Sequence, residues 1–483
     1  MKYKITALFE EHKITGINFD SKKIKSGEAF FAIRGSKFDG NEYIEDALKA
    51  GASLIFSDCE SHKDNNSIVY VEDIRASLII AAEIFYLKTP KNLIAVTGTN
   101  GKTSVVSYCQ QLFALLGNES ASLGTIGLVC SDKNITTKFD TEQYKALTST
   151  DILTFRQILN YLAENNINNL AFEASSHGID QQRLGNLQVQ AAAFTNFSQD
   201  HLDYHGTMKN YLNTKLKLFT SHLARDGLAV ISSEISEIDY IKEFFNKNDI
   251  NYLTVGTTGK MKIYSADQLM TGQNIAFSYE GKDYNFQTEI IGSFQASNLL
   301  IAAALVHKFK IASMDEIIKK ITSVKAVKGR LERITQVNDH FQVFVDYSHT
   351  PESLGKALIE LKKIKSASGK LIVVFGCGGN RDVGKRPLMG EISSRYAGIQ
   401  IVTDDNPRFE DPSAIRRQIL AAVPQAKEIG DRTLAITTAV NMLEHGDILL
   451  IAGKGHEDYQ IIGDVKIPLD DSKIARSALE NKI

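Results

Sequence analysis

A glycine-rich loop between an aliphatic run and an amphipathic pattern leaves few folds open to this chain. The aliphatic run covers residues 93–97, and the loop reads Gly98-Thr99-Asn100-Gly101-Lys102-Thr103-Ser104. Apolar residues then recur at helical spacing, at Val105, Cys109, Leu112 and Leu116. Together these patterns predict a strand, a tight loop and a helix, and an α/β fold organised around them.

Such a loop predicts a nucleotide phosphate site. Glycines let backbone amides converge on phosphate oxygens, and the N-terminus of the helix adds partial positive charge. The Lys102 ammonium can reach the outer phosphates, and the Thr103 hydroxyl is a candidate Mg²⁺ ligand. Because the general pattern places a glycine where Val96 stands, a glycine turn with a solvated lysine is the alternative interpretation.

Length and charge exclude several other classes of protein. At 483 residues, with 43% hydrophobic and 23% charged residues, the chain is long enough for two to four globular domains. A net charge of −2 gives no general attraction to nucleic acid or to an anionic membrane, so we expect neither as a partner. The four cysteines form no C-x-x-C pair and no apolar run approaches the roughly 18 residues of a membrane span, which predicts a cytoplasmic protein without structural zinc.

Strand and helix patterns predict three domains. Residues 1–88 fit a small α/β domain that ends where Lys88-Thr89-Pro90 breaks a helix expected over 77–87. Alternating strands and helices over 89–325 predict a central doubly wound, phosphate-loop domain. Residues 326–483 fit a Rossmann-like C-terminal domain with strands at 341–346, 371–375, 400–403 and 448–452.

Two stretches of the central domain carry candidate metal ligands. Glu173 ends an apolar strand beside serines and a glycine, where burying a carboxylate is costly unless it is paired or binds a metal. The alternative is a structural carboxylate that caps the next helix. In the second stretch, two histidines and two aspartates fall within residues 200–205, and by residue type alone these could form a zinc site.

Polar loops follow the expected strands of the other two domains. Three of these segments are the loops at 19–22 and 35–40 and the turn at 148–151. Their polar residues could serve only to form turns and to cap helices, which is the structural alternative to a binding role. In the C-terminal domain, three strand-end loops carry Arg381, Arg408 and Glu457. Opposite charges at neighbouring strand ends predict a site for a zwitterionic ligand.

In this order, the motifs resemble the Mur ligases, the amino-acid-adding enzymes of peptidoglycan precursor synthesis, over nearly the whole chain. The matching stretches are the G-T-N-G-K-T loop, 173–183, 195–215, G-R-L-E at 329–332, D-Y-S-H-T-P at 346–351 and D-N-P-R at 405–408. Two departures are Gln295, where the family has Asn, and Ser149-Thr150, where it has Thr-Pro.

The resemblance implies roles for individual residues. The ATP site would comprise Gly98, Thr99, Asn100, Gly101, Lys102, Thr103, Ser104, Asn298, Arg330 and Asp346. Mg²⁺ ligands would be Thr103, Glu173, His201 and a carbamylated Lys215, with Lys102, Lys215 and Arg330 as the catalytic residues. The uridine-nucleotide peptide would contact Phe19, Ser21, Ser36, Lys37, Phe38, Thr148, Ser149, Ser175, Gln181 and Arg183.

The resemblance also implies the reaction. A ligase of this kind uses ATP to activate the D-Glu carboxylate of UDP-MurNAc-L-Ala-D-Glu as an acyl phosphate, which the amine of meso-diaminopimelate then attacks. Diaminopimelate would be held by Arg381, Asp405, Asn406, Pro407, Arg408, Gly453 and Glu457, and we expect a monomer. The alternatives are folylpolyglutamate synthase, which lacks a uridine-binding domain ahead of the phosphate loop, and a catalytically silent nucleotide-binding scaffold.

Overall fold

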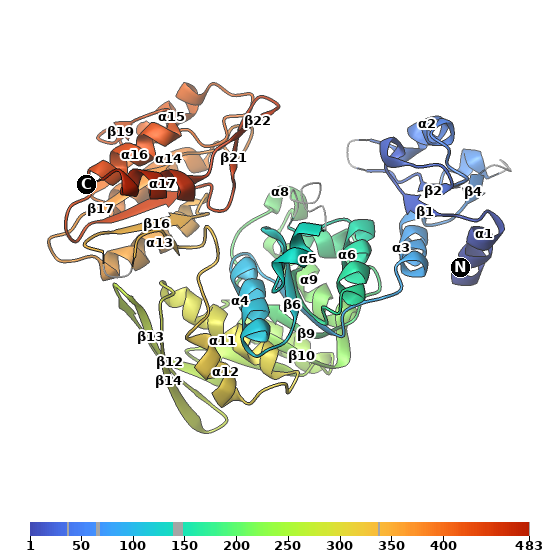
Figure 1. The fold of residues 1–483 in the computed structure, drawn as a ribbon, viewed down its shortest axis with the longest axis horizontal. Coiled ribbons are helices and arrows are strands. Elements are labelled where there is room, and N and C mark those ends of the chain that lie inside the picture. The colour runs from blue at the N-terminus through green and yellow to red at the C-terminus, as the bar shows by residue number, and fades with distance from the viewer. Residues whose placement is uncertain (36–37, 64–67, 139–147, 337–338, 483) are drawn as a thin grey trace. The chain divides into compact units, whose positions relative to one another are not determined.

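The computed structural model describes residues 1–483 except 36–37, 64–67, 139–147, 337–338 and 483 (Figure 1). The described residues form two compact units: one of 1–99, 117–229 and 239–252, the other of 100–116, 230–238 and 253–483. Ser36 and Lys37, two of the expected uridine-binding residues, lie outside the described residues. Across the described parts of the chain, no helix combines the length and apolarity that crossing a membrane requires.

The first unit begins with a four-stranded parallel sheet in the order β1-β2-β3-β4. Its elements are α1 (Lys2–Glu11), β1 (Gly16–Asn18), η1 (Ser21–Lys23), β2 (Glu28–Phe31), η2 (Gly40–Tyr43), α2 (Ile44–Lys49), β3 (Leu54–Ser57), η3 (Glu60–His62), β4 (Ile68–Tyr70) and α3 (Ile74–Phe85). Phe31 and Phe56 stack between strands with ring centroids 4.5 Å apart. Apolar side chains on both faces of the sheet build its core, as parallel strands covered on two sides require.

The rest of the first unit is built on strands in the order β10-β9-β5-β8-β6-β7. The strands are β5 (Asn92–Thr97), β6 (Ser120–Gly124), β7 (Gly127–Cys130), β8 (Asn169–Glu173), β9 (Val189–Phe194) and β10 (Leu223–Ser232). The helical segments are α5 (Lys133–Lys138), α6 (Ile152–Glu164), α7 (Ser176–Asp180), α8 (Leu202–His205), α9 (Met208–Lys217), η5 (Leu218–His222) and α10 (Ile238–Lys247). Because β5, β6, β8 and β9 run parallel, the loops that follow β5, β8 and β9 gather at one edge.

The second unit continues from the end of β10 with β11 (Tyr252–Gly256), β12 (Met261–Leu269), β13 (Gly272–Tyr279) and β14 (Lys282–Thr288). β12, β13 and β14 pair antiparallel, which interrupts the strand–helix alternation that we expected through residue 325. The turn before β13 uses Gly272, whose φ of +151° strains any residue with a side chain. Helices α4 (Lys102–Leu115), α11 (Ser293–His307) and α12 (Met314–Ile321) also belong to this unit.

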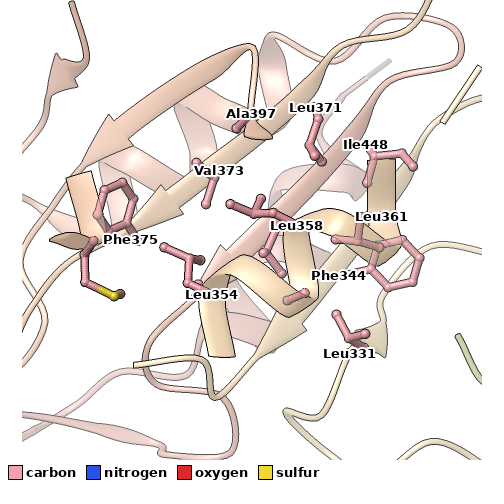
Figure 2. Close-up of a cluster of buried hydrophobic side chains, with 14 of the residues drawn as sticks. Leu331, Phe344, Leu354, Leu358, Leu361, Leu371, Val373, Phe375, Ala397 and Ile448 are labelled. Carbon is pink, nitrogen blue, oxygen red and sulfur yellow. The ribbon is translucent and has the colours of Figure 1, made fainter. Parts of the chain in front are cut away.

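A six-stranded sheet in the order β15-β16-β20-β17-β18-β19 forms the C-terminal part. Its strands are β15 (Glu332–Arg333), β16 (Gln342–Asp346), β17 (Leu371–Phe375), β18 (Ile399–Val402), β19 (Lys427–Glu428) and β20 (Ile448–Ala452), and only β15 pairs antiparallel. Helices α13 (Pro351–Ile364), α14 (Lys385–Tyr396), α15 (Pro412–Leu420), α16 (Arg432–Asn441) and α17 (Asp471–Glu480) and the hairpin of β21 (Tyr459–Ile462) and β22 (Val465–Pro468) complete it. Leucines of α13 pack onto Phe344 and Val373 of the sheet (Figure 2).

Candidate active site

The phosphate-type loop has the predicted strand–loop–helix form. β5 ends at Thr97, and α4 begins at Lys102 after Gly101, whose φ is +85°. Within the first unit, Thr99 donates its amide to Asn196 O at 2.8 Å, and its hydroxyl bonds to Ser198 O at 3.1 Å. A Cβ at Gly98 would lie 2.1 Å from Thr195 Oγ1, so the loop has room only for glycine there.

Several residues expected to contact the substrate peptide meet around Glu173. Glu173 is 3% exposed, and its carboxylate accepts the Thr125 amide at 2.8 Å and the Thr125 hydroxyl at 3.1 Å. Thr125 Oγ1 also lies within hydrogen-bond distance of Thr148 Oγ1, at 3.3 Å. The Ser149 hydroxyl donates to Glu173 O and accepts the Ser175 amide, each at 3.0 Å, so the 148–151 turn and the 173–183 motif converge at the end of β8.

Arg183 and Gln181 extend this cluster. The Arg183 guanidinium donates to Ser149 O at 2.6 Å and to Gln181 Oε1 at 2.7 and 3.1 Å. Burial lowers the pKa of Arg183 from its ordinary value, and the charge of Asp151 opposes this change. Arginine side chains stay protonated in proteins, so the group is a cation. A fixed guanidinium beside two serines is suited to an anionic peptide or diphosphate ligand.

Aromatic and imidazole rings form a second cluster in the first unit. The His177 ring lies 4.8 Å from the His201 ring and 4.2 Å from the Tyr204 ring, centroid to centroid. Burial, together with the charges of His201 and His205, lowers the pKa of His177, so this imidazole is neutral at pH 7. His201 has a φ of +53° and precedes α8, whereas His205 lies within α8, so the two do not form the face of a zinc-binding helix.

Lys215 is buried on α9, with 1% of its surface exposed. Its Nζ lies 4.4 Å from the centroid of the Tyr211 ring, four residues earlier on the same helical face. Tyr211 OH is 3.3 Å from Thr99 Oγ1 in the phosphate-type loop, and its ring is 6.1 Å from that of His201. Tyr211 therefore links the buried lysine with the loop, a role that the sequence motifs did not reveal.

In the second unit, Arg330 contacts the helix that follows the loop. Its Nη2 donates to Thr103 Oγ1 at 3.2 Å, and its guanidinium lies 4.7 Å from the Tyr347 ring centroid. Burial raises the pKa of Tyr347 to about 12 and lowers that of His456, whose ring is 5.0 Å away, to about 4. Both side chains are neutral at pH 7, so Arg330 supplies the positive charge of this group.

Asp346 supports the same group from the end of β16. Its carboxylate accepts the amides of Leu331 at 2.7 Å and Ser348 at 2.9 Å, and it also accepts the Ser348 hydroxyl. Burial raises the pKa of Asp346 although these donors and Arg330 oppose the change. The carboxylate thereby fixes the chain on either side of Arg330 and of Tyr347.

Asn298 is held on α11 by its neighbours. Its amide donates to Gln295 Oε1 at 2.9 Å, and Gln295 also accepts the Tyr108 hydroxyl at 3.1 Å. Gln295, with 1% exposure, thus replaces the asparagine of the motif by a residue that reaches α4. The expected contact of Asn298 with adenine stays a prediction.

The D-N-P-R loop folds against the hairpin of β21 and β22. The backbone of Arg408 has a φ of +52°. Its N–H donates to Ile461 O at 3.0 Å, and its carbonyl oxygen accepts a hydrogen bond from the Gly463 N–H at 2.8 Å. Its Nη1 bonds to Gly379 O at 2.9 Å, so the guanidinium reaches the loop after β17, where Arg381 is exposed. The structure thus brings Arg408 to the glycine-rich loop.

Glu457 joins the same group. Its Oε2 accepts a hydrogen bond from the side-chain amide nitrogen of Asn406, Nδ2, at 3.0 Å. A Cβ on Gly453, whose φ is +117°, would lie 2.7 Å from Asp405 Oδ2, so only glycine fits there. Five of the candidate residues therefore lie at neighbouring strand ends: Asp405, Asn406, Arg408, Gly453 and Glu457. Their expected contacts with a zwitterionic ligand stay a prediction.

Buried charged side chains that support this site belong to none of the sequence motifs. Arg432 and Asp471 form a salt bridge at 2.7 Å with no exposure of either side chain. Arg386, 1% exposed, pairs with Glu410 at 2.9 Å and donates to Gly378 O at 3.3 Å. Arginines in helical patterns look like surface residues in a sequence, and only the fold shows that they are interior.

The N-terminal candidates lie in loops beside β1 and β2. Phe19 packs at the margin of the domain core, whereas Phe38 is 68% exposed. Ser21 opens the short helix η1, and Asp20 caps it by accepting the Lys22 amide at 3.1 Å. Their expected contacts with uridine stay predictions.

Three family models match the chain in succession. They are described as Mur ligase family, catalytic domain (residues 13–86), Mur ligase middle domain (96–306) and Mur ligase, glutamate ligase domain (329–455). A ligase from Rickettsia bellii, named UDP-N-acetylmuramoyl-L-alanyl-D-glutamate--2,6-diaminopimelate ligase, is 53% identical and covers 97% of this chain and 96% of its own. The chain belongs to the Mur ligase family.

Other relatives and solved structures are similar to this Mur ligase over nearly the whole chain. A protein of the same name from Zymomonas mobilis is 39% identical over 99% of this chain and 97% of its own. A solved structure of such a diaminopimelate ligase superposes with a TM-score of 0.69 at 30% identity, covering 97% of this chain and 95% of that one. The MurF ligase from Thermotoga maritima shares the fold, with a TM-score of 0.63 at 18% identity and 98% of each chain covered. The predicted three-domain α/β architecture of a Mur ligase is confirmed, while the limits at residues 88 and 325 stay a prediction.

Proposed function

We propose that this Mur ligase joins meso-diaminopimelate to UDP-MurNAc-L-Ala-D-Glu at the expense of ATP, in the cytoplasm, during peptidoglycan precursor synthesis. The observation that carries the proposal is 53% identity, over 97% of the chain, to a relative named for this activity. The arrangement of candidate residues supports it, because phosphate, peptide and zwitterion chemistry each have their own loops.

The reaction requires activation because a carboxylate and an ammonium do not condense in water. Transfer of the γ-phosphoryl group of ATP to the D-Glu carboxylate gives an acyl phosphate and ADP. Attack by the deprotonated amine forms a tetrahedral intermediate, which collapses to the amide and expels phosphate. Lys102 and Arg330 would neutralise phosphoryl oxygens, while Arg183 and Ser149 would hold the anionic substrate.

The donor set fits Mg²⁺. Glu173 is buried and held through Thr125, and carboxylate and hydroxyl oxygens are the ligands that Mg²⁺ prefers. Among the described residues, however, no group of three or more His, Cys, Asp and Glu side chains could hold a metal. A carbamate on Lys215 would supply anionic oxygen ligands, and Glu173 and His201 are the other candidate Mg²⁺ ligands of the first unit. Thr103 would be a ligand of the Mg²⁺ that accompanies ATP. When bound, Mg²⁺ would stabilise the charge on the transferring phosphoryl group.

The proposed function predicts which substrates release ADP. We expect the purified protein to release ADP over repeated turnovers only when ATP, UDP-MurNAc-L-Ala-D-Glu and meso-diaminopimelate are all present. A coupled ADP assay, with mass spectrometry of the nucleotide product, would check this. A folate substrate in place of the muramyl nucleotide tests the folylpolyglutamate alternative, and absence of turnover with every acceptor would favour a silent scaffold.

The loop itself gives a second prediction. Lys102→Ala should lower the rate on the order of 10³-fold or more, because the lost ammonium acts on the transferring phosphoryl group. Lys91→Ala is the matched control, since Lys91 is exposed and precedes the same strand. Steady-state kinetics would measure both variants, and a rate for Lys102→Ala within a few-fold of the native rate would remove the loop from the mechanism.

A further inference from the structure

Lys454 is a fully buried lysine at the zwitterion site that no sequence motif led us to expect. It follows β20, and its side chain is 0% exposed. Its ammonium donates to Asn406 Oδ1 at 3.0 Å and to Glu457 Oε2 at 3.1 Å. Burying an ammonium is costly unless it is paired, so these two contacts explain why the side chain can stay inside.

These contacts orient both partners. Asn406 Oδ1 also accepts the Ile461 amide at 2.9 Å, which leaves the Asn406 amide nitrogen to donate to Glu457 Oε2. Glu457 Oε2 therefore receives two bonds from the interior. No partner of Glu457 Oε1 is found in the described part of the chain, and the side chain keeps 19% exposure. One oxygen of the carboxylate is therefore fixed by two donors, and the other keeps its capacity to accept a hydrogen bond from a ligand.

Lys454 also acts on the carboxylate next to Asn406. Burial alone would raise the pKa of Asp405, but the charges of Lys454 and Arg432 outweigh it, and the pKa is lowered. Asp405 Oδ1 accepts a hydrogen bond from the backbone N–H of Asn406 at 2.7 Å, and this bond holds the start of the D-N-P-R loop. The interior ammonium thus contacts one acidic side chain of the site, Glu457, and favours the ionised form of the other, Asp405.

We propose that Lys454 is a positioning residue that sets Glu457 and the D-N-P-R loop for the distal ammonium and carboxylate of the amino-acid substrate. The inference rests on the proposed function, because it assumes a diammonium dicarboxylate ligand at this site. A purely structural lysine would brace the strand ends, as Arg432 does through Asp471 and Ala452 O. Lys454 instead contacts side chains of two predicted ligand residues.

The test replaces Lys454 by methionine, which keeps its approximate length but removes the charge. We expect Lys454→Met to raise the KM for diaminopimelate about 10- to 100-fold, since charge-assisted hydrogen bonds that aim Glu457 are lost. The KM values for ATP and the muramyl nucleotide should stay within about twofold. Lys466→Met is the matched control, because Lys466 is an exposed lysine 4.5 Å from the Tyr459 ring, which Lys454 contacts from 5.7 Å.

A double-mutant cycle separates positioning from bracing. If Lys454 acts through Glu457, adding Lys454→Met to Glu457→Gln should raise the KM for diaminopimelate little further. Additive effects, or equal rises in all three KM values, would overturn the proposal. Circular dichroism and thermal unfolding check each variant, with Lys454→Gln as a second replacement; if neither variant folds, Lys454 is structural and the inference is wrong. Wild-type protein that does not use diaminopimelate would instead refute the proposed function.

Discussion

Replacing Lys215 by alanine is expected to abolish turnover while the protein remains folded. In the proposed mechanism a carbamate at this position converts a buried cation into an anion that can bind Mg²⁺, and alanine cannot be carbamylated. Lys215 Nζ lies over the Tyr211 ring, whose hydroxyl contacts the phosphate-type loop at Thr99. Kinetics together with circular dichroism of the variant would measure both parts of the expectation.

Depletion of carbon dioxide is an independent test of the carbamate on Lys215. Removing CO₂ from the native protein should lower its activity, and adding bicarbonate should restore it, whereas Lys215→Ala should respond to neither. Lys209→Ala, an exposed lysine on the same helix, should keep native activity. Near-native turnover by folded Lys215→Ala would eliminate the carbamate from the mechanism.

The second large effect concerns the choice of amino acid. We expect kcat/KM for meso-diaminopimelate to exceed that for L-lysine by roughly 10⁴-fold, because a guanidinium built to pair a carboxylate is left unpaired by lysine. The Arg408 side chain donates to Gly379 O in the loop that carries Arg381, so its cation is held at the same loop as the second candidate arginine. Initial rates with each amino acid at matched ATP and nucleotide concentrations give the ratio.

Substitutions test which side chain produces the preference for meso-diaminopimelate over L-lysine. Arg408→Ala should raise the KM for diaminopimelate about 10²-fold and narrow the discrimination against lysine, with kcat less affected. Arg417→Ala removes an arginine on α15 that is 67% exposed and should change neither value. Comparable kcat/KM for both amino acids in the native enzyme would refute the assignment.

Much of the framework could be predicted from local sequence. β17 and β20 have the limits expected for them, because a short aliphatic run bounded by glycine or charge has one plausible register in a buried parallel sheet. Helices were harder to delimit. α11 begins at Ser293, six residues before the aliphatic run that starts at Leu299, and there the Ser293 amide and hydroxyl both bond to Glu360, 67 residues further along the chain.

The sequence predicted which residues belong to the candidate site, but not which side chains hydrogen-bond to one another there. The motifs named Glu173, Ser149 and Ser175, yet Thr125, which holds the Glu173 carboxylate, comes from a turn with no motif. Lys454 stands inside a recognised loop, but nothing in a lysine's sequence position shows that it is buried. Contacts between distant segments, and the burial of charge, depend on packing that local patterns do not encode.

The left-handed backbone of Arg408 gives the protein an unusual trade-off. A residue with a side chain pays roughly 1–2 kcal/mol in that conformation, which glycine would avoid. The conformation is held by main-chain bonds to Ile461 and Gly463, which any residue other than proline can form at this position. Exchange of this single side chain could therefore retune ligand preference without rebuilding the loop, and the fold carries a standing energetic penalty for keeping arginine at that place.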